Sequence, residues 1–227
     1  EDDIRAMASN REGILRISTE CYTCYHWLPG ILKLFAQSFA GIEVRIVAEA
    51  TRRPVEALLD GKIDLAITSS HVRNSKMSFK PLFKDELVVV MATDHDLSSR
   101  PWISAHDFTS QHLITYALPK EELTFFKKVL IPSGVSPRKI SRIELTEAII
   151  EMVKAGLGIS VMARWAVAPF LSSGSLRAVP LTKRGQHRQW YGATLKAAKS
   201  LAYVSKFIEL AGELNLNAGF EADRRGS

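Results

Sequence analysis

The apolar and polar residues of the first 70 positions follow two alternating periods. A short apolar run is typical of a strand, whereas apolar residues recurring every three or four positions are typical of a helix with one buried face. These periods predict a strand at 14–18, a helix at 28–39, a strand at 42–47, a helix from Pro54 and a strand at 63–68. Strand, helix, strand, helix, strand is the order of a parallel sheet flanked by helices.

The same order begins again after residue 93. Apolar strands at 79–83 and 86–92 precede the break. Beyond it, the pattern predicts a helical turn at 102–108, a strand at 112–116, a helix at 121–130, a strand at 140–145, a helix from Thr146 and a strand at 159–162. Strands at 176–181 and 189–195 and a helix at 201–211 complete the chain. The sequence therefore predicts an α/β fold of two Rossmann-like lobes, and pockets favour the cleft between such lobes.

Polar residues follow three of the strands predicted in the first half. In open parallel sheets, ligands bind beyond the carboxyl ends of the strands. The three strand ends carry Ser18-Thr19, Glu49-Ala50-Thr51 and Thr68-Ser69-Ser70. The first also precedes a predicted helix, whose free N–H groups and positive dipole end can hold a carboxylate. Hydroxyl residues are common in ordinary turns as well, so a polar small-molecule pocket and plain turns are both open at this point.

The composition is that of a soluble globular protein. Of the 227 residues, 46% are hydrophobic and 24% are charged, which suffices for a core. There is no run of about 18 apolar residues, so no membrane span is expected. The charged start, Glu1-Asp2-Asp3-Ile4-Arg5, does not have the pattern of a signal peptide, although an exported protein that has lost its signal is compatible with it.

The charge of the chain restricts its partners only weakly. A net charge of +6 suits anionic small molecules or a weak attraction to nucleic acid. The basic residues are too dispersed to establish a DNA-reading surface. The tight clusters, Lys183-Arg184 with Arg188 and Arg224-Arg225, are expected on the solvated surface.

Cys21 and Cys24 are the two cysteines of the chain, too few for a disulfide scaffold and in keeping with a reducing compartment. Their C-x-x-C spacing directly after the first strand fits a redox dithiol, and His26 adds a third ligand type for zinc. A structural zinc site needs about four ligands, and no second Cys or His pair follows at ligand spacing. Burial of two small side chains in a turn is the simpler interpretation.

Motifs for catalysis are missing from the sequence. It contains no Gly-x-Ser-x-Gly and no His-Glu-x-x-His. Gly156-x-Gly158 lacks the third glycine of a dinucleotide fingerprint and follows a helix, so a helix end and a tight turn are expected there. Trp27 and Trp165 are expected to be packing residues. We therefore expect neither an enzyme nor a cofactor or metal site.

Three segments resemble the effector-binding part of LysR-type transcriptional regulators, and the resemblance extends over about 14–214. The segment 58–67, LLDGKIDLAI, is similar to the family's L-x-x-G-x-L-D-h-h-h, where h is apolar. In 81–90, Pro-Leu precedes the apolar run, as in the family. The segment 153–162, VKAGLGISVM, is similar to V-x-x-G-x-G-I-x-h-h-P. Together these segments are fairly specific.

The chain departs from the family pattern at two turns. His95-Asp96-Leu97 stands where many members have His-Pro-Leu, and Arg164 stands near a usual proline. Because only turns are affected, the expected fold is unchanged. The resemblance implies a type 2 periplasmic-binding-protein-like fold, with its two lobes joined by crossover strands.

The resemblance also implies how the chain is divided. Residues 14–93 with 189–215 would form lobe I, 94–188 lobe II, 1–13 the remnant of a linker and 216–227 a C-terminal tail. A DNA-binding winged helix-turn-helix would precede this chain and is absent from it. The implied partners are a small-molecule effector, promoter DNA through the missing domain, RNA polymerase, and further copies of the chain in a homodimer or homotetramer. A cytoplasmic location without membrane contact is implied.

The block at 20–28, ECYTCYHWL, is similar to that of the family's methionine-pathway regulators, whose effector is homocysteine. Homocysteine carries a carboxylate, an ammonium and a thiol. By this resemblance, the turn after the first strand would bind the carboxylate of homocysteine, and Glu20 or Glu49 would pair with its ammonium. The candidate effector-binding residues, facing an interlobe cleft, are Ser18, Thr19, Glu20, Cys21, Thr23, Glu49, Thr51, Thr68, Ser69, Tyr116 and Thr146.

Two other functions stay open. A periplasmic-type solute-binding protein for a small amino acid or carboxylate would have a similar two-lobed plan, and the segment preceding the chain would distinguish it. A small thiol enzyme would need reactive thiols at Cys21 and Cys24.

Overall fold

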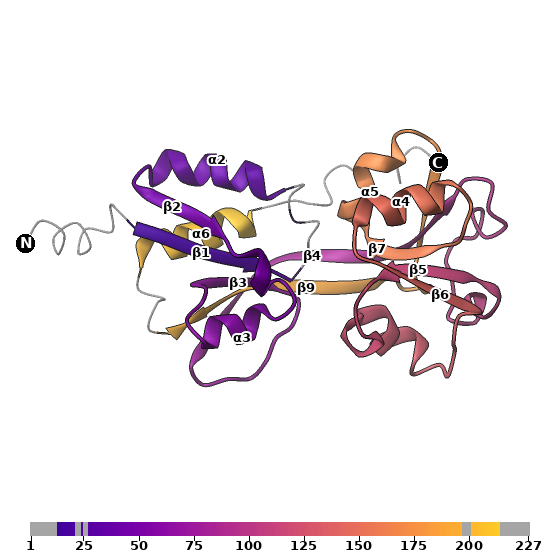
Figure 1. Cartoon of the computed structure of the whole chain (residues 1–227), viewed down its shortest axis with the longest axis horizontal. Helices are drawn as coiled ribbons and strands as arrows, with labels where there is room; N and C mark the ends of the chain where they lie inside the picture. Colours follow the sequence, from indigo (N-terminus) through magenta and orange to yellow (C-terminus); the bar gives the residue numbers. More distant parts are fainter. Residues whose placement is uncertain (1–12, 21–23, 25–26, 197–200, 214–227) are drawn as a thin grey trace, which may run out of the picture. The chain divides into compact units, whose positions relative to one another are not determined.

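The computed structural model describes residues 13–20, 24, 27–196 and 201–213. Two compact units make up the chain: unit 1 is Glu1–Lys84 with Gln189–Ser227, and unit 2 is Asp85–Arg188 (Figure 1). The chain leaves unit 1 after Lys84, earlier than the expected crossing after residue 93. It returns at Gln189.

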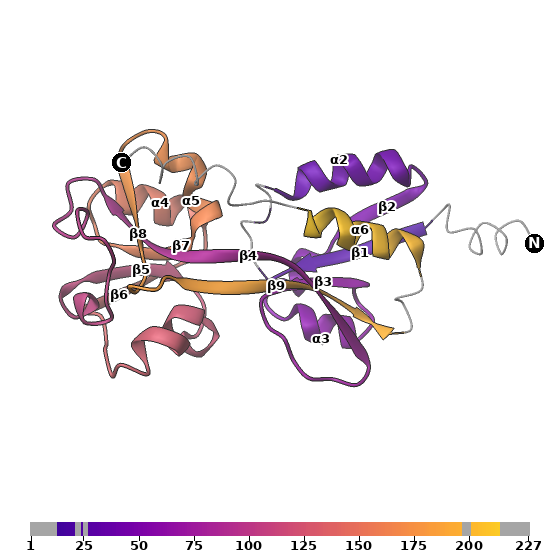
Figure 2. The same ribbon diagram turned by 180° about the vertical axis from the view of Figure 1, so that it is seen from behind.

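Unit 1 is built on a sheet with the order β2-β1-β3-β9. β1 (Gly13–Thr19), β2 (Ile42–Ile46) and β3 (Leu65–Thr68) are parallel, and β9 (Gln186–Leu195) is antiparallel to β3. β4 (Met77–Ala92) is the neighbour of β9 in the sheet (Figure 2). The three parallel strands, with a helix after each of the first two, confirm the order predicted for the first 70 residues.

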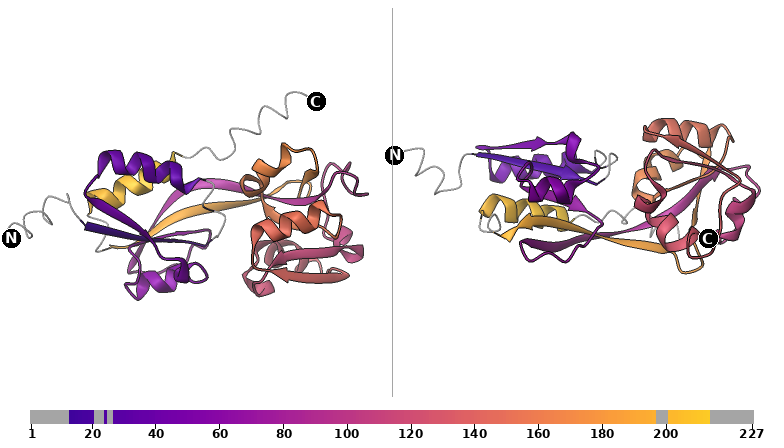
Figure 3. Two further views of the ribbon diagram at one scale, coloured as in Figure 1. Left: turned by 45° about the horizontal axis from the view of Figure 1, so that its top comes forward. Right: turned by 60° about the horizontal axis from the view of Figure 1, so that its bottom comes forward.

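One face of this sheet is covered by α2 (Leu28–Ser38) and α6 (Ala202–Gly212), which lie side by side (Figure 3). The rings of Phe35 and Phe207 meet edge to face, with their centroids 5.4 Å apart. Both rings are almost completely buried. Burial of these two large aromatic side chains joins the two helices, which are distant in sequence, into one layer.

The opposite face is covered by α3 (Pro54–Leu59), which follows a 3₁₀ turn, η2, at Ala48–Ala50. Leu58 of α3 is fully buried in one apolar cluster with Ala66 of β3. Side chains alternate between the two faces of a strand. Ser18, the register partner of Ala66, therefore lies on the α3 face.

Unit 2 has a parallel pair, β5 (His112–Tyr116) and β6 (Lys139–Ile143). It also has two strands antiparallel to β4, namely β7 (Ser160–Ala163) and β8 (Leu176–Pro180). Its first apolar cluster surrounds the fully buried Phe108. The second cluster forms under α4 (Thr146–Lys154), whose members there are Ile149, Ile150 and Val153.

β4 is one continuous strand, where two strands were expected at 79–83 and 86–92. The junction between them contains Asp85, which is 1% exposed. Its carboxylate accepts hydrogen bonds from Arg188 and from the indole N–H of Trp165. Because these donors satisfy the buried charge, it can lie inside a strand.

The prediction of a regular helix at 121–130 is wrong. The chain instead forms a 3₁₀ turn, η4, at Lys120–Glu122 and a π-helical turn, η5, at Phe126–Leu130. Its residues predicted to face inward are nevertheless buried: Leu123, Phe126 and Leu130. The adjacent Phe125 is buried as well. A regular helix with one apolar stripe does not readily bury two successive large rings, and the wider turn accommodates both.

Two further local expectations needed correction. The helical turn expected at 102–108 lies later, as a 3₁₀ helix, η3, at His106–Ser110. A helix that the sequence pattern did not predict, α5, occupies Arg164–Leu171. It contains Pro169 and buries three successive residues near its start, so its apolar residues show no helical spacing.

Candidate functional site

Glu20 directly follows β1 and is held against the end of β3. Its backbone N–H donates to the carbonyl oxygen of Ile67 at 2.8 Å. Its side-chain Oε2 accepts hydrogen bonds from Thr68 Oγ1 at 2.6 Å, from the Ser69 backbone N–H at 2.6 Å and from Ser69 Oγ at 3.2 Å. Its Oε1 accepts one from Ser70 Oγ at 3.3 Å. Both the backbone and the carboxylate of Glu20 are therefore fixed by the segment that ends β3.

These contacts bring together residues that the sequence placed at two separate strand ends. We call Glu20, Thr68, Ser69 and Ser70 the β1-end polar group. Ser70, which was not among the candidates, belongs to it because it donates to Glu20. The uninterrupted run of hydroxyl residues at 68–70 is the sequence signal that identifies Ser70.

Ser18 is fully buried on the side of the sheet that α3 covers. It is 0% exposed, and its Oγ has no hydrogen-bond partner within the described part of the chain. A buried hydroxyl without a partner is costly and is expected to have a compensating role. Of the two candidates near η2, Thr51 is buried and Glu49 is exposed.

Thr19 lies on the opposite face from Ser18, because successive side chains of β1 alternate. Its Oγ1 donates to the sulfur of Cys24 at 3.0 Å, and both side chains are buried. The candidates Cys21 and Thr23 and the third zinc-ligand residue, His26, lie outside the described residues. Burial of Cys24 agrees with the interpretation of this cysteine as a packing residue in the turn.

Tyr116 and Thr146 are brought together in unit 2. Tyr116 ends β5 and Thr146 opens α4, and their hydroxyl oxygens lie 3.2 Å apart in a hydrogen bond. Thr146 is buried. Of the predicted residues, Glu20, Thr68 and Ser69 are thus brought together in unit 1, and Tyr116 and Thr146 in unit 2.

Trp27 and Trp165, both expected to be packing residues, are buried. The ring of Trp27 meets that of Phe83 edge to face at 5.6 Å, and Phe83 stacks on Trp190 at 5.8 Å. Trp165 donates to Asp85 in unit 2. Beside it, Arg164 Nε donates to Glu86 Oε2 at 2.8 Å, so the residue standing near the family's usual proline forms an ion pair.

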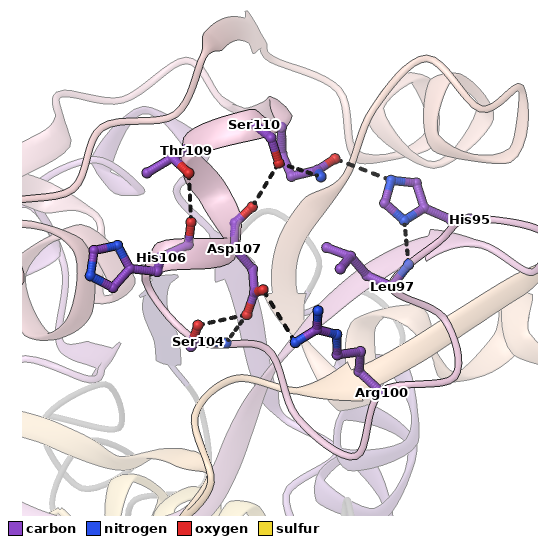
Figure 4. Close-up of polar contacts among 9 residues, drawn as sticks. His95, Leu97, Arg100, Ser104, His106, Asp107, Thr109 and Ser110 are labelled. Carbon is purple, nitrogen blue, oxygen red and sulfur yellow. Dashed lines mark hydrogen bonds and ion pairs between the residues drawn. The ribbon is translucent and has the colours of Figure 1, made fainter.

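The turn at 95–97, where the chain departs from His-Pro-Leu, is held by side-chain hydrogen bonds (Figure 4). His95 Nδ1 accepts from the Leu97 backbone N–H at 3.1 Å, and its Nε2 lies 3.2 Å from Gln111 Oε1. Nearby, Asp107 accepts from the hydroxyl and the backbone N–H of Ser104. These contacts join the turn to Gln111 and fix the segment around Asp107, so they stabilise this part of unit 2 and do not point to a ligand.

Membrane-spanning helices and metal clusters are both missing from the described residues. None of their helices combines the length and the apolar character needed to cross a membrane. No three or more of their His, Cys, Asp and Glu side chains are grouped closely enough to hold a metal ion.

Comparison with known proteins identifies the family of the chain. Residues 8–215 match the LysR substrate binding domain. The regulator MetR of Haemophilus influenzae is 34% identical over 209 residues, which are 92% of this chain and 67% of that protein. MetR of Escherichia coli K12 is 32% identical over 160 residues, 70% of this chain and 50% of that protein. The chain thus spans about half to two thirds of the length of these relatives, which are transcriptional regulators and not enzymes.

Solved structures lead to the same family. The regulatory domain of MetR from N. meningitidis, a LysR family regulator, has a TM-score of 0.81 at 35% identity, covering 88% of this chain and 93% of that one. The effector binding domain of QuiR, solved in complex with shikimate, has a TM-score of 0.70 at 25% identity, covering 88% and 96%. The type 2 periplasmic-binding-protein-like fold predicted from the sequence is confirmed. This chain therefore belongs to the LysR family of transcriptional regulators, of which it is an effector-binding domain.

Proposed function

We propose that this domain senses a small amino acid, with homocysteine as the effector, in a regulator of methionine-biosynthesis genes. The observation that carries the proposal is the β1-end polar group, which gathers polar side chains from the ends of β1 and β3. Ligands of open α/β sheets bind beyond the carboxyl ends of strands. Similarity to two MetR proteins supports the pathway.

The carboxylate of the effector would lie at the turn between β1 and α2. Thr19 ends β1, and α2 begins with free backbone N–H groups and Pro29 in its first turn. The proposed contacts include Cys21 and Thr23 of the intervening segment. The buried sulfur of Cys24, which accepts from Thr19, gives this face a soft, weakly polar wall suited to a thiol.

The remaining candidates have supporting roles in the proposal. In unit 1, the polar lining of the site would be completed by Ser18, Thr51, Thr68 and Ser69. In unit 2, hydroxyl groups would come from Tyr116 and Thr146. Glu49, being exposed, would contribute only a screened charge.

Effector binding would act on transcription through a DNA-binding domain that precedes this one. A ligand shifts an equilibrium between conformations only by its difference in affinity for them. We propose promoter DNA, RNA polymerase and further copies of the chain, as a homodimer or homotetramer, as partners in the cytoplasm.

Isothermal titration calorimetry and thermal unfolding with L-homocysteine, L-methionine and L-cysteine test the effector. At a homocysteine concentration of 100 times its Kd, stability should rise by about 2.7 kcal/mol through mass action. Methionine, which lacks the thiol, and cysteine, which is one methylene shorter, should produce smaller shifts. Absence of any response to millimolar homocysteine would rule it out as the effector.

A further inference from the structure

We infer that Glu20 is a fixed anionic group that recognises the ammonium of the effector, so that the site selects α-amino acids over the corresponding deaminated acids. The inference rests on the proposed function and adds the group that determines specificity. Glu20 and Glu49 are equal candidates from the sequence alone, and the structure separates them.

The carboxylate of Glu20 is held by neutral donors. Its hydrogen bonds come from the hydroxyls of Thr68, Ser69 and Ser70 and from one backbone N–H. None of the ion pairs formed among the described residues involves Glu20. A half-buried carboxylate whose position is fixed without a cation attracts a cationic group, and this attraction is stronger there than in bulk water.

The two carboxylate oxygens differ in how they are occupied. Oε2 accepts three hydrogen bonds, two of them at 2.6 Å. Oε1 accepts a single, longer one at 3.3 Å. A carboxylate oxygen has two lone-pair sites. Oε2 thus anchors the group, whereas Oε1 keeps acceptor capacity for a donor on a ligand.

An ammonium fits this acceptor better than a metal ion does. Calcium takes six to eight oxygen ligands, commonly from several carboxylates. Around Glu20, the neighbouring hydroxyls already donate to its carboxylate, and no cluster of three His, Cys, Asp or Glu side chains occurs in the described ranges. An ammonium has three N–H donors and needs one strong anionic acceptor with a few neutral ones. Ser18 Oγ, buried and without a partner among the described residues, lies two residues before Glu20 at the end of β1 and is one such neutral acceptor.

Glu49 lacks these properties. Its side chain is exposed, at the 3₁₀ turn after β2. An exposed charge that is free to move is screened by water and salt, and it gains little from pairing. Glu49 therefore provides the matched control for Glu20: the same residue type in the same unit, without the anchoring hydrogen bonds.

Calorimetry on the wild-type chain and on Glu20→Gln and Glu49→Gln variants tests the inference. The ligands are L-homocysteine and 4-mercaptobutanoate, which is the same molecule without its amine. The wild-type chain should prefer homocysteine, and Glu20→Gln should lower homocysteine affinity about 10- to 100-fold, as expected for loss of a charged hydrogen bond. Affinity for 4-mercaptobutanoate should change little, and Glu49→Gln should lower homocysteine affinity far less than Glu20→Gln does, because the Glu49 charge is exposed and screened.

Two results would overturn the inference: equal wild-type affinity for both ligands, or an equal loss for both in Glu20→Gln. If Glu20→Gln fails to fold, judged by its circular dichroism, Glu20→Asp provides the same comparison. This variant keeps the negative charge on a side chain that is one methylene shorter. The preference for homocysteine over 4-mercaptobutanoate should therefore fall while the fold is retained.

The proposed effector and the role of Glu20 can fail separately. If the wild-type chain does not bind homocysteine, the effector proposal fails. The same calorimetric comparison is then made with the standard amino acids and their deaminated counterparts. A preference for any amine-bearing member that is lost in Glu20→Gln supports the inference. No such preference across the panel contradicts it.

Discussion

Arg16 of β1 and Asp64, just before β3, form a bidentate ion pair. Arg16 Nη2 lies 2.7 Å from Asp64 Oδ1, and Arg16 Nε donates to Oδ2 at 3.0 Å. The backbone N–H of Arg16 also donates to Oδ2, at 2.8 Å. The side-chain hydrogen bond with Asp64 raises the pKa of Arg16 above its ordinary value. This pair gives the aspartate of the LLDGKIDLAI segment a structural role: it joins two neighbouring parallel strands.

Asp64→Asn should destabilise unit 1 by about 1–2 kcal/mol, because an amide cannot accept from all three donors. Solvent screening keeps this cost small, since the side chains of Arg16 and Asp64 are 38% and 24% exposed. Urea unfolding provides the measurement. The matched control is Asp60→Asn, which removes an exposed pair with Lys62 and should cost less than about 0.5 kcal/mol. Equal effects of the two changes would show that the Arg16 pair adds no stability.

Gly158→Ala should be more destabilising than Gly156→Ala. A Cβ at Gly158 would overlap the backbone carbonyl of His112, which cannot move without disturbing β5, and such overpacking costs about 1–3 kcal/mol. Gly156 has a φ of +71° with open space around it, so alanine there meets only the left-handed strain of about 1 kcal/mol. The φ of Gly156 confirms the helix end predicted for this motif.

Gly30→Ala is the control for these glycine changes. Gly30 lies in α2, and apart from its chain neighbours and the backbone of the helix itself no atom lies within 4 Å of the position that an added methyl group would take, so alanine should stabilise the helix by about 0.5–1 kcal/mol. Thermal unfolding of the three variants should therefore give melting temperatures in the order Gly30→Ala, Gly156→Ala, Gly158→Ala, from highest to lowest. A Gly158→Ala melting temperature at the wild-type value would contradict the close approach to His112.

Thr115→Val should stabilise unit 2 by up to about 1 kcal/mol. The Thr115 hydroxyl is buried, 1% exposed, and has no hydrogen-bond partner in the described structure. Replacing a buried hydroxyl that lacks a partner by a methyl removes a desolvation cost. Thr146→Val, at a similarly buried threonine that bonds to Tyr116, should destabilise by about 1 kcal/mol. Loss of stability in both variants, measured by chemical unfolding, would mean that the Thr115 hydroxyl is satisfied in solution.

Asp107 should make stability depend on acid pH. Burial acts to raise the pKa of Asp107, but hydrogen bonds from the Ser104 hydroxyl and backbone N–H, with the charges of Arg100 and His106, lower it below its ordinary value of 3.8. The folded-state pKa is thus the lower one. The ionised Asp107 contributes stability above pH 3.8, and this contribution is lost as pH falls through the folded-state pKa.

Unfolding of the wild type and Asp107→Asn as a function of pH measures this contribution. The wild type should be more stable than the variant at neutral pH, and the difference should shrink below about pH 4. Asp96→Asn is the control, at an aspartate of the preceding turn that makes no such contacts within the described part of the chain. A difference between wild type and Asp107→Asn that does not change with pH would exclude the titration of Asp107 as its source.

Thr19→Ala should weaken homocysteine binding about tenfold, if the effector carboxylate lies at the turn after β1. The variant also loses the hydrogen bond to Cys24, so circular dichroism and melting temperature must be measured with it. The exposed Thr109 of unit 2 provides the control, Thr109→Ala, which should bind as the wild type. A loss of affinity that parallels a loss of helical signal would show that Thr19 is only structural.

Several elements followed from local pattern because the interactions that form them are local. β1 and α4 begin within one residue of their predicted starts, since a short apolar run and a helical apolar spacing are read directly from neighbouring positions. The failures involve distant partners. The buried Asp85 interrupts an apolar run in sequence, yet it lies within β4 because Arg188 neutralises it from a position 103 residues away.

For the candidate site, the sequence by itself determined that hydroxyl residues stand at the ends of β1 and β3 and that a glutamate directly follows β1. Only the tertiary structure decided how these groups are used. Thr68, Ser69 and Ser70 are 48 to 50 residues from Glu20, and parallel pairing of β1 with β3 brings them to its carboxylate. Periodicity specifies which face a side chain occupies but not which distant donor satisfies it. That choice depends on strand register, which is a property of the folded sheet.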